Sequence, residues 1–184
     1  MEKNKIKKIL YSTPCWQVLG YLMQHPDIIV RGANLVKVKE LCHISKSAIY
    51  EAIHLLEKID VLIKEKDTGG YRVNLGLNNA WLRYIMIADA LVQLQPLANG
   101  LSESASRIIL FGSRAKGEHT SDSDYDVFVV SGQDAQVRRI VNKNPLSERI
   151  QLLIKTPEEW IDLHRTDPVL YQTLQEGIIL WERK

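Results

Sequence analysis

The feature that most constrains this chain is a polar loop held between two short apolar runs. Residues 107–112 (Arg-Ile-Ile-Leu-Phe-Gly) are largely apolar and end in glycine, and Ser113 follows directly. Ten residues separate Ser113 from the triplet 124–126 (Asp-Tyr-Asp), which leads into a second apolar run at 127–130. Both runs have the length and composition of buried strands. The pattern therefore predicts two core strands joined by a polar loop.

This loop combines two kinds of ligand-binding group. Where the first strand ends at Gly112-Ser113 and a helical turn begins, backbone N–H groups without an intrahelical partner can bind a phosphate. Side chains two apart on a strand face the same way, so Asp124 and Asp126 should present their carboxylates side by side. A hard cation such as Mg²⁺ would offset their repulsion, and it binds through one or two carboxylates plus substrate phosphates. The loop therefore has the equipment for metal-assisted phosphoryl or nucleotidyl transfer.

The same residues resemble the DNA polymerase β-like nucleotidyltransferase superfamily, in particular its minimal nucleotidyltransferases, over about residues 100–184. The resemblance implies a small mixed sheet with helices on one side. It implies that Asp124 and Asp126 are the catalytic carboxylates and bind two Mg²⁺ ions, and that the substrate is an NTP, most plausibly ATP. The nucleotide-binding residues that it implies are Gly112 and Ser113 at the triphosphate, with Arg114 and Lys116 either as phosphate neighbours or as solvated charges.

One position departs from the family's pattern. The family usually adds a third carboxylate on a later strand, where it completes one metal site and helps to activate the acceptor hydroxyl. Here the later strand is 149–154, and the expected acid falls at or beside Gln151, whose amide cannot act as a base. Glu148 is the nearest alternative, but three positions away it would lie on the opposite face of a regular strand. Nucleotide binding is therefore an expectation separate from turnover. His119, inside the motif loop, is expected to be a solvent-exposed loop residue, with a substrate contact as the alternative.

The first part of the chain has a different charge and a different pattern. Residues 1–78 carry 12 Lys and Arg against 8 Asp and Glu, whereas residues 79–184 carry 12 against 14. Such an asymmetry suggests different partners for the two parts. Apolar residues recur at helical spacing in three segments, at about 13–23, 36–42 and 46–59. Two short strands follow, separated by a turn rich in glycine.

This order of helix, helix, tight turn, helix and β-hairpin resembles a winged helix-turn-helix domain from about residue 12 to residue 76. In that family the third helix enters the major groove, and the wing meets phosphates or the minor groove. The DNA-binding candidates that the resemblance implies are Lys46, Ser47, Tyr50 and His54 on the helix, and Lys64, Lys66 and Arg72 on or near the wing. Glu51 on the same helix face would repel phosphate, and a winged helix used only for protein contacts or dimerisation is the alternative.

The sequence therefore predicts an α+β protein in three parts: a winged helix-turn-helix domain at 1–77, a linking helix region at 78–104 and a nucleotidyltransferase domain at 105–184. The linking helix is apolar nearly all round, which suits burial on several sides or pairing with a second copy in a homodimer. The longest apolar stretch, 81–94, is shorter than the roughly 20 residues that span a bilayer. With no signal peptide at the N-terminus, the expected location is the cytoplasm, without membrane contact.

Three functions fit these patterns. The first is a Mg²⁺-dependent enzyme that moves NMP from an NTP to a hydroxyl of a protein or a small molecule; by resemblance to minimal members of the family, this includes an antitoxin that modifies a HEPN-type toxin. The second is a transcriptional regulator on double-stranded DNA, whose weak or inactive nucleotidyltransferase-fold domain binds nucleotide. The third is an interaction module without either activity.

Overall fold

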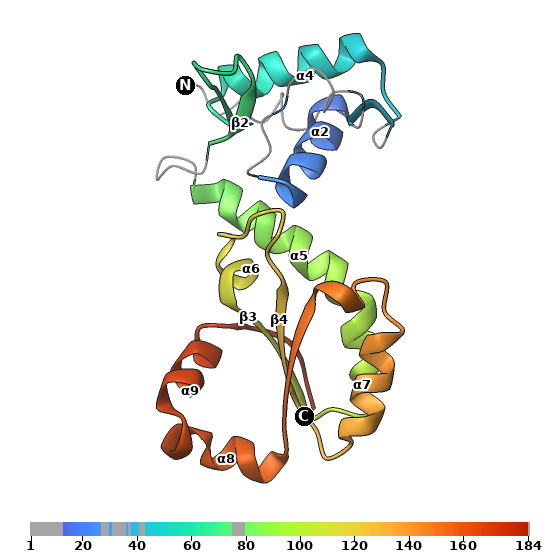
Figure 1. Ribbon diagram of the computed structural model, residues 1–184, viewed down its shortest axis with the longest axis vertical. Helices are drawn as coiled ribbons and strands as arrows, with labels where there is room; N and C mark the ends of the chain where they lie inside the picture. Colours follow the sequence, from blue (N-terminus) through green and yellow to red (C-terminus); the bar gives the residue numbers. More distant parts are fainter. Residues whose placement is uncertain are drawn as a thin grey trace. The chain divides into compact units, whose positions relative to one another are not determined.

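The computed structural model describes residues 13–26, 30, 36, 38–40, 43–74 and 80–183 (Figure 1). The chain divides into two compact units, Met1–Met86 and Ile87–Lys184. One long helix, α5 (Ala80–Leu101), contains the boundary between them. None of the helices in the described ranges is long and apolar enough to cross a membrane.

Among the described residues, the first unit includes the helices α2 (Thr13–Gln24) and α4 (Lys46–Lys58) and a hairpin of the antiparallel strands β1 (Leu62–Lys64) and β2 (Tyr71–Val73). Ser45 caps α4, because its Oγ accepts a hydrogen bond of 3.2 Å from the Ala48 N–H. The predicted second helix, 36–42, is helical at 36 and 38–40, and its remaining positions lie outside the described residues. The winged helix itself stays a prediction.

The second unit is built on a four-stranded mixed sheet with the order β5-β4-β3-β6. The central pair β3 and β4 is antiparallel, β6 pairs antiparallel with β3, and β5 runs parallel to β4. The strands are β3 (Arg107–Phe111), β4 (Tyr125–Val130), β5 (Ile150–Lys155) and β6 (Ile178–Glu182). The remaining elements are α6 (Gly112–Lys116), α7 (Asp134–Asn142), the 3₁₀ turn η2 (Ser147–Arg149), α8 (Pro157–Thr166) and α9 (Pro168–Gln175). The predicted mixed sheet with helices is therefore present.

Helices cover both faces of this sheet, so the expectation of helices on one side was wrong (Figure 1). Val127 and Val129 of β4 pack in a core with residues of α5 and α7. Phe128 and Val130, on the opposite face of the same strand, pack in a second core with Leu163 of α8. The physical reason is visible in the sequence, because a strand that is apolar at successive positions must be buried on both faces.

Candidate active site

The two predicted carboxylates lie together at the start of β4. Asp126 is half-buried and belongs to the strand, where its Cα pairs with Phe111 of β3 on one side and Gln151 of β5 on the other. Asp124 is exposed and precedes the first paired residue of the strand. Burial raises the pKa of Asp126, and the nearby Asp124 carboxylate raises it further, whereas the Arg114 guanidinium lowers it. The site therefore disfavours two bare negative charges and would favour a cation between them.

Gly112 packs directly against the Asp126 carboxylate. It adopts a left-handed conformation, with φ of 70°, at the point where β3 passes into α6. A Cβ atom at this position would lie 2.9 Å from Asp126 Cγ and nearer still to Asp126 Oδ2. Only glycine satisfies both conditions, since it lacks the Cβ and accepts positive φ without strain. The sequence predicted Gly112 at a nucleotide-binding turn, and the structure brings that turn into contact with Asp126.

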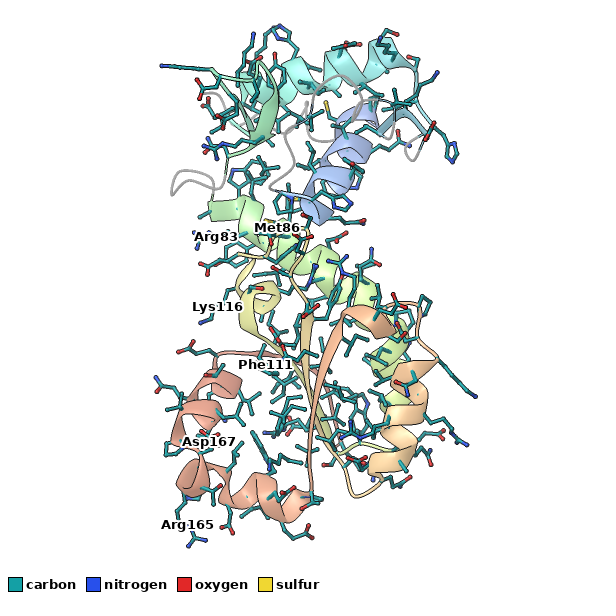
Figure 2. All side chains as sticks on the ribbon, viewed as in Figure 1. Arg83, Met86, Phe111, Lys116, Arg165 and Asp167 are labelled. Atoms are coloured by element: carbon teal, nitrogen blue, oxygen red, sulfur yellow. The ribbon has the colours of Figure 1, made fainter. Side chains whose placement is uncertain are left out.

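The two basic candidates on α6 lie in different environments. Lys116 is exposed and forms an ion pair of 3.0 Å with Glu176, and Figure 2 labels it together with Phe111, the residue before Gly112. Arg114 is only 2% exposed, and its guanidinium donates hydrogen bonds to the backbone carbonyls of Ser123 and Asp124. Arg114 is thus occupied by the loop, rather than held as a solvated charge at the surface.

The third-carboxylate position is filled by an amide. Gln151 is exposed, and its Cα pairs in register with that of Asp126 on the neighbouring parallel strand. Glu148 lies before the strand, exposed, in the 3₁₀ turn η2. In the part of the chain that the structure describes, no three or more His, Cys, Asp and Glu side chains gather as a metal site. Two carboxylates alone fit Mg²⁺ that is shared with substrate phosphates.

His119 differs from its prediction, which was wrong. Instead of lying exposed in the loop it is 1% exposed, and Gly117, two residues before it, is also buried. The loop folds inward because the Arg114 and Arg149 side chains donate hydrogen bonds to its backbone carbonyls. Arg149 donates to Ser121 O at 2.6 Å and to Ser123 O at 3.2 Å. Sequence reasoning missed Arg149 entirely, since nothing in its own neighbourhood marks it as a partner of this loop.

The seven DNA-binding candidates are exposed on two elements of the first unit. Four of them, Lys46, Ser47, Tyr50 and His54, are on α4. The other three, Lys64, Lys66 and Arg72, are on or beside the β1–β2 hairpin. The Lys46 Nζ lies 5.9 Å from the centre of the Tyr50 ring, and Arg72 forms an ion pair with Glu65. Both elements thus offer cations to solvent, with the charge of Arg72 partly neutralised.

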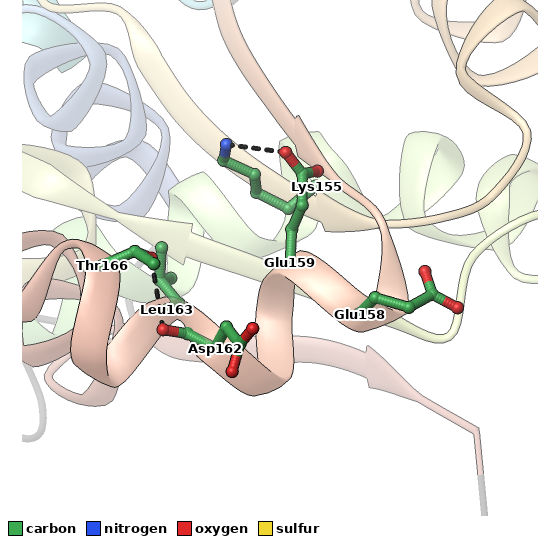
Figure 3. Close-up of a pocket in the computed structure, with 6 residues that line it drawn as sticks. All are labelled: Lys155, Glu158, Glu159, Asp162, Leu163 and Thr166. Carbon is green, nitrogen blue, oxygen red and sulfur yellow. Dashed lines mark hydrogen bonds and ion pairs between the residues drawn. The ribbon is translucent and has the colours of Figure 1, made fainter.

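A separate pocket of about 350 Å³ lies along α8 (Figure 3). Its wall carries the ion pair between Lys155 and Glu159, 3.1 Å apart, together with the side chains of Glu158 and Asp162. A backbone hydrogen bond from Thr156 lowers the pKa of Glu159, as expected of a carboxylate in a helix N-terminal capping box. None of the predicted site residues lines this pocket, and its negative charge would repel a nucleotide.

The contact between Gly112 and Asp126 gives a direct prediction. Gly112→Ala would cost about 1–2 kcal/mol for the left-handed backbone and would push the Asp126 carboxylate aside. A misplacement of about 1 Å at a reacting centre can cost about 10²-fold in rate, so we expect nucleotidyl transfer to fall by at least about that factor. Gly132→Ala is the matched control, because a Cβ there has no atom within 4 Å. Equal transfer rates for the two variants would show that the contact does not matter.

Comparison with known proteins agrees with this geometry. A family model described as "Polymerase beta, Nucleotidyltransferase" matches residues 94–184, which include the sheet, the Gly112 turn and both carboxylates. No curated protein matches the chain. The match and the site together support a nucleotidyltransferase domain of the polymerase β type at residues 94–184.

Proposed function

We propose that the second unit transfers NMP from an NTP, with ATP as the preferred donor, to a hydroxyl of a protein or a small molecule in a Mg²⁺-dependent reaction. The observation that carries the proposal is the contact of Gly112 with Asp126, because it joins the phosphate-binding turn to the carboxylate pair. The family match supports nucleotidyl transfer in general. The donor, the acceptor and the metal are our inference.

In this proposal each residue has a distinct role. The backbone at Gly112 and the Ser113 hydroxyl bind the triphosphate. The exposed Lys116, on the same short helix, adds positive charge beside this nucleotide-binding turn. Asp124 and Asp126 hold Mg²⁺ against the phosphates; when bound, the metal neutralises charge that develops on the reacting phosphoryl group. Gln151 lies beside Asp126 and can accept or donate a hydrogen bond, but it cannot take the proton from the acceptor hydroxyl. The acceptor oxygen bonds to the α-phosphorus as the bond between the α-phosphorus and the β-phosphate oxygen breaks, and pyrophosphate leaves. The acceptor proton passes to water or to a group on the acceptor, so turnover by the unaided domain is slow.

The acceptor is best sought with labelled donor. The full chain is incubated with each NTP labelled at the α-phosphate, with Mg²⁺, and with a panel of protein and small-molecule acceptors that includes a HEPN-type toxin. Transfer of label from ATP, abolished by EDTA, is the expected result. Binding of ATP with no transfer to any acceptor would favour a nucleotide-binding regulator instead. No binding of any NTP would remove the proposal.

A second function, DNA binding by the first unit, is favoured by the exposed cations of α4 and the hairpin. We expect binding to double-stranded DNA that weakens with salt, with a log–log slope of about 0.9 per phosphate neutralised. Lys46→Ala should reduce this slope by about one, and Lys58→Ala, at the far end of α4, serves as the comparison. Salt-independent binding, or none, would leave the first unit as a protein-contact domain.

A further inference from the structure

Asp124 and Asp126 are held in different ways. Asp126 lies within the ladder of β4, where strand pairing on both sides fixes its backbone. The ladder begins at Tyr125, so Asp124 is the last residue of the loop and strand pairing does not fix it. A metal shared by the two carboxylates requires both at a set separation. Something other than the sheet must therefore fix Asp124.

The Arg114 side chain meets this requirement. Its Nε donates to Asp124 O at 3.1 Å and to Ser123 O at 3.2 Å, and its Nη2 donates to Ser123 O at 2.8 Å. Arg114 also belongs to α6, the short helix that starts at Gly112. One guanidinium thus connects the predicted phosphate-binding turn to the backbone of the first carboxylate residue.

The surroundings of Arg114 make this connection rigid. Its guanidinium carbon lies 3.9 Å from the centre of the Tyr125 ring, which is itself 4% exposed. A buried charge is costly unless it is paired, and the carboxylates of Asp89 and Asp124 supply opposite charge near it. Arg149, in η2, also donates hydrogen bonds to this loop, at Ser121 O and Ser123 O. A buried, multiply bonded guanidinium has few alternative positions.

We propose that Arg114 is a positioning residue, which holds the Ser123–Asp124 backbone so that the Asp124 carboxylate stands beside Asp126 and the nucleotide turn. The inference rests on the proposed function, because the position of Asp124 matters through the metal–nucleotide. It assigns Arg114 to the loop in place of the direct phosphate contact that the sequence suggested. The planar guanidinium, whose N–H donors have a fixed arrangement, matters as well as its charge. A lysine ammonium is a compact charge on a flexible chain and does not reproduce this arrangement.

Two measurements on the whole chain of residues 1–184 test this role. The first is amide hydrogen exchange of the segment 118–126, which needs no ligand. The second is the affinity for a nonhydrolysable ATP analogue, measured once in EDTA and once with Mn²⁺. The variants are Arg114→Met and Arg114→Lys. Arg107→Met is the matched control, because Arg107 also lies over an aromatic ring (Trp160) and forms an ion pair (with Glu182), but does not contact the loop.

We expect Arg114→Met to speed exchange in 118–126 by about tenfold and to reduce the gain in affinity that Mn²⁺ provides by about 10-fold, as for outer-shell partners of metal ligands. Affinity in EDTA should stay close to that of the wild type, because in this proposal Arg114 does not contact the phosphates. Arg114→Lys should restore part of the protection, and Arg107→Met should match the wild type in both measurements.

Two outcomes would overturn the role. Wild-type exchange in the Arg114→Met loop would show that Arg114 does not hold it, and an equal loss of affinity in EDTA and in Mn²⁺ would assign Arg114 to the phosphates. If Arg114→Met does not fold, Arg149→Met removes the Arg149 hydrogen bonds to the loop instead. It should change the exchange rate of 118–126 and the gain in affinity from Mn²⁺ in the same direction by a smaller factor. Wild-type values for Arg149→Met would also overturn the proposal. If the wild type binds no analogue at all, the proposed function fails, and the exchange measurement still decides the positioning role.

Discussion

Asp126→Asn is expected to lower nucleotidyl transfer by about 10³-fold, because an amide in place of a carboxylate removes several kcal/mol of metal-dependent charge stabilisation at the reacting phosphate. Asp124→Asn should act in the same direction. Asp122→Asn is the matched control, since Asp122 is an exposed carboxylate in the same loop. The measurement is the initial rate of label transfer from ATP at saturating Mg²⁺. A rate for Asp126→Asn within tenfold of the control would contradict the assignment.

The same substitution should stabilise the metal-free protein. The pKa of Asp126 is raised in the folded state, first by burial and then by Asp124. The folded state therefore holds this proton more tightly than the unfolded state, and stability falls as pH rises through the folded pKa. Asp126→Asn removes this loss, so its melting temperature should exceed that of the wild type at neutral pH, with a smaller difference below the unfolded pKa of about 3.9. A lower melting temperature at neutral pH would show that the carboxylate is not strained in the absence of metal.

Gln151→Glu is expected to raise the transfer rate by about 10²-fold or more, within the 10²–10⁴ range of a positioned general base. The position is suited to this change, because Gln151 is exposed and its Cα pairs with Asp126. A third carboxylate beside two others also raises repulsion. The variant should therefore need more Mg²⁺ for half-maximal rate and melt lower than the wild type without metal.

Gln136→Glu, on the exposed side of α7, adds the same charge away from the site and should leave the rate unchanged. The measurement is the rate of label transfer across a Mg²⁺ titration, with the acceptor held constant. An unchanged rate for Gln151→Glu at saturating Mg²⁺ would mean that proton removal does not limit the reaction, or that position 151 does not face the acceptor. The amide would then be a neutral replacement rather than a cause of slow turnover.

Some of the fold and the site followed directly from sequence patterns. The apolar runs predicted β3 and β4, and the later apolar run at 149–154 predicted β5. The resemblance to the nucleotidyltransferase family implied a third-carboxylate position on a later strand at or beside Gln151, and Gln151 lies on β5, where its Cα pairs with Asp126. These features depend on local composition and on strand periodicity, which can be read directly from the sequence.

Other features were not accessible from the sequence. The burial of Arg114 depends on hydrogen bonds to the backbone carbonyls of Ser123 and Asp124. Every residue has a backbone carbonyl, so no sequence pattern marks these two as the partners of Arg114. His119 was misplaced for the same reason, because the inward path of its loop is set by Arg114 and Arg149. The tight approach of Gly112 to Asp126 depends on the register of β3 and β4, which periodicity alone does not fix.

The most direct test of the account is label transfer from α-labelled ATP by the wild type and by the double variant Asp124→Asn/Asp126→Asn, each with Mg²⁺ and with EDTA. The account predicts transfer by the wild type in Mg²⁺ alone, with the other three reactions at background. Transfer by the double variant at the wild-type rate, or transfer that survives EDTA, would contradict a metal-dependent reaction at the carboxylate pair.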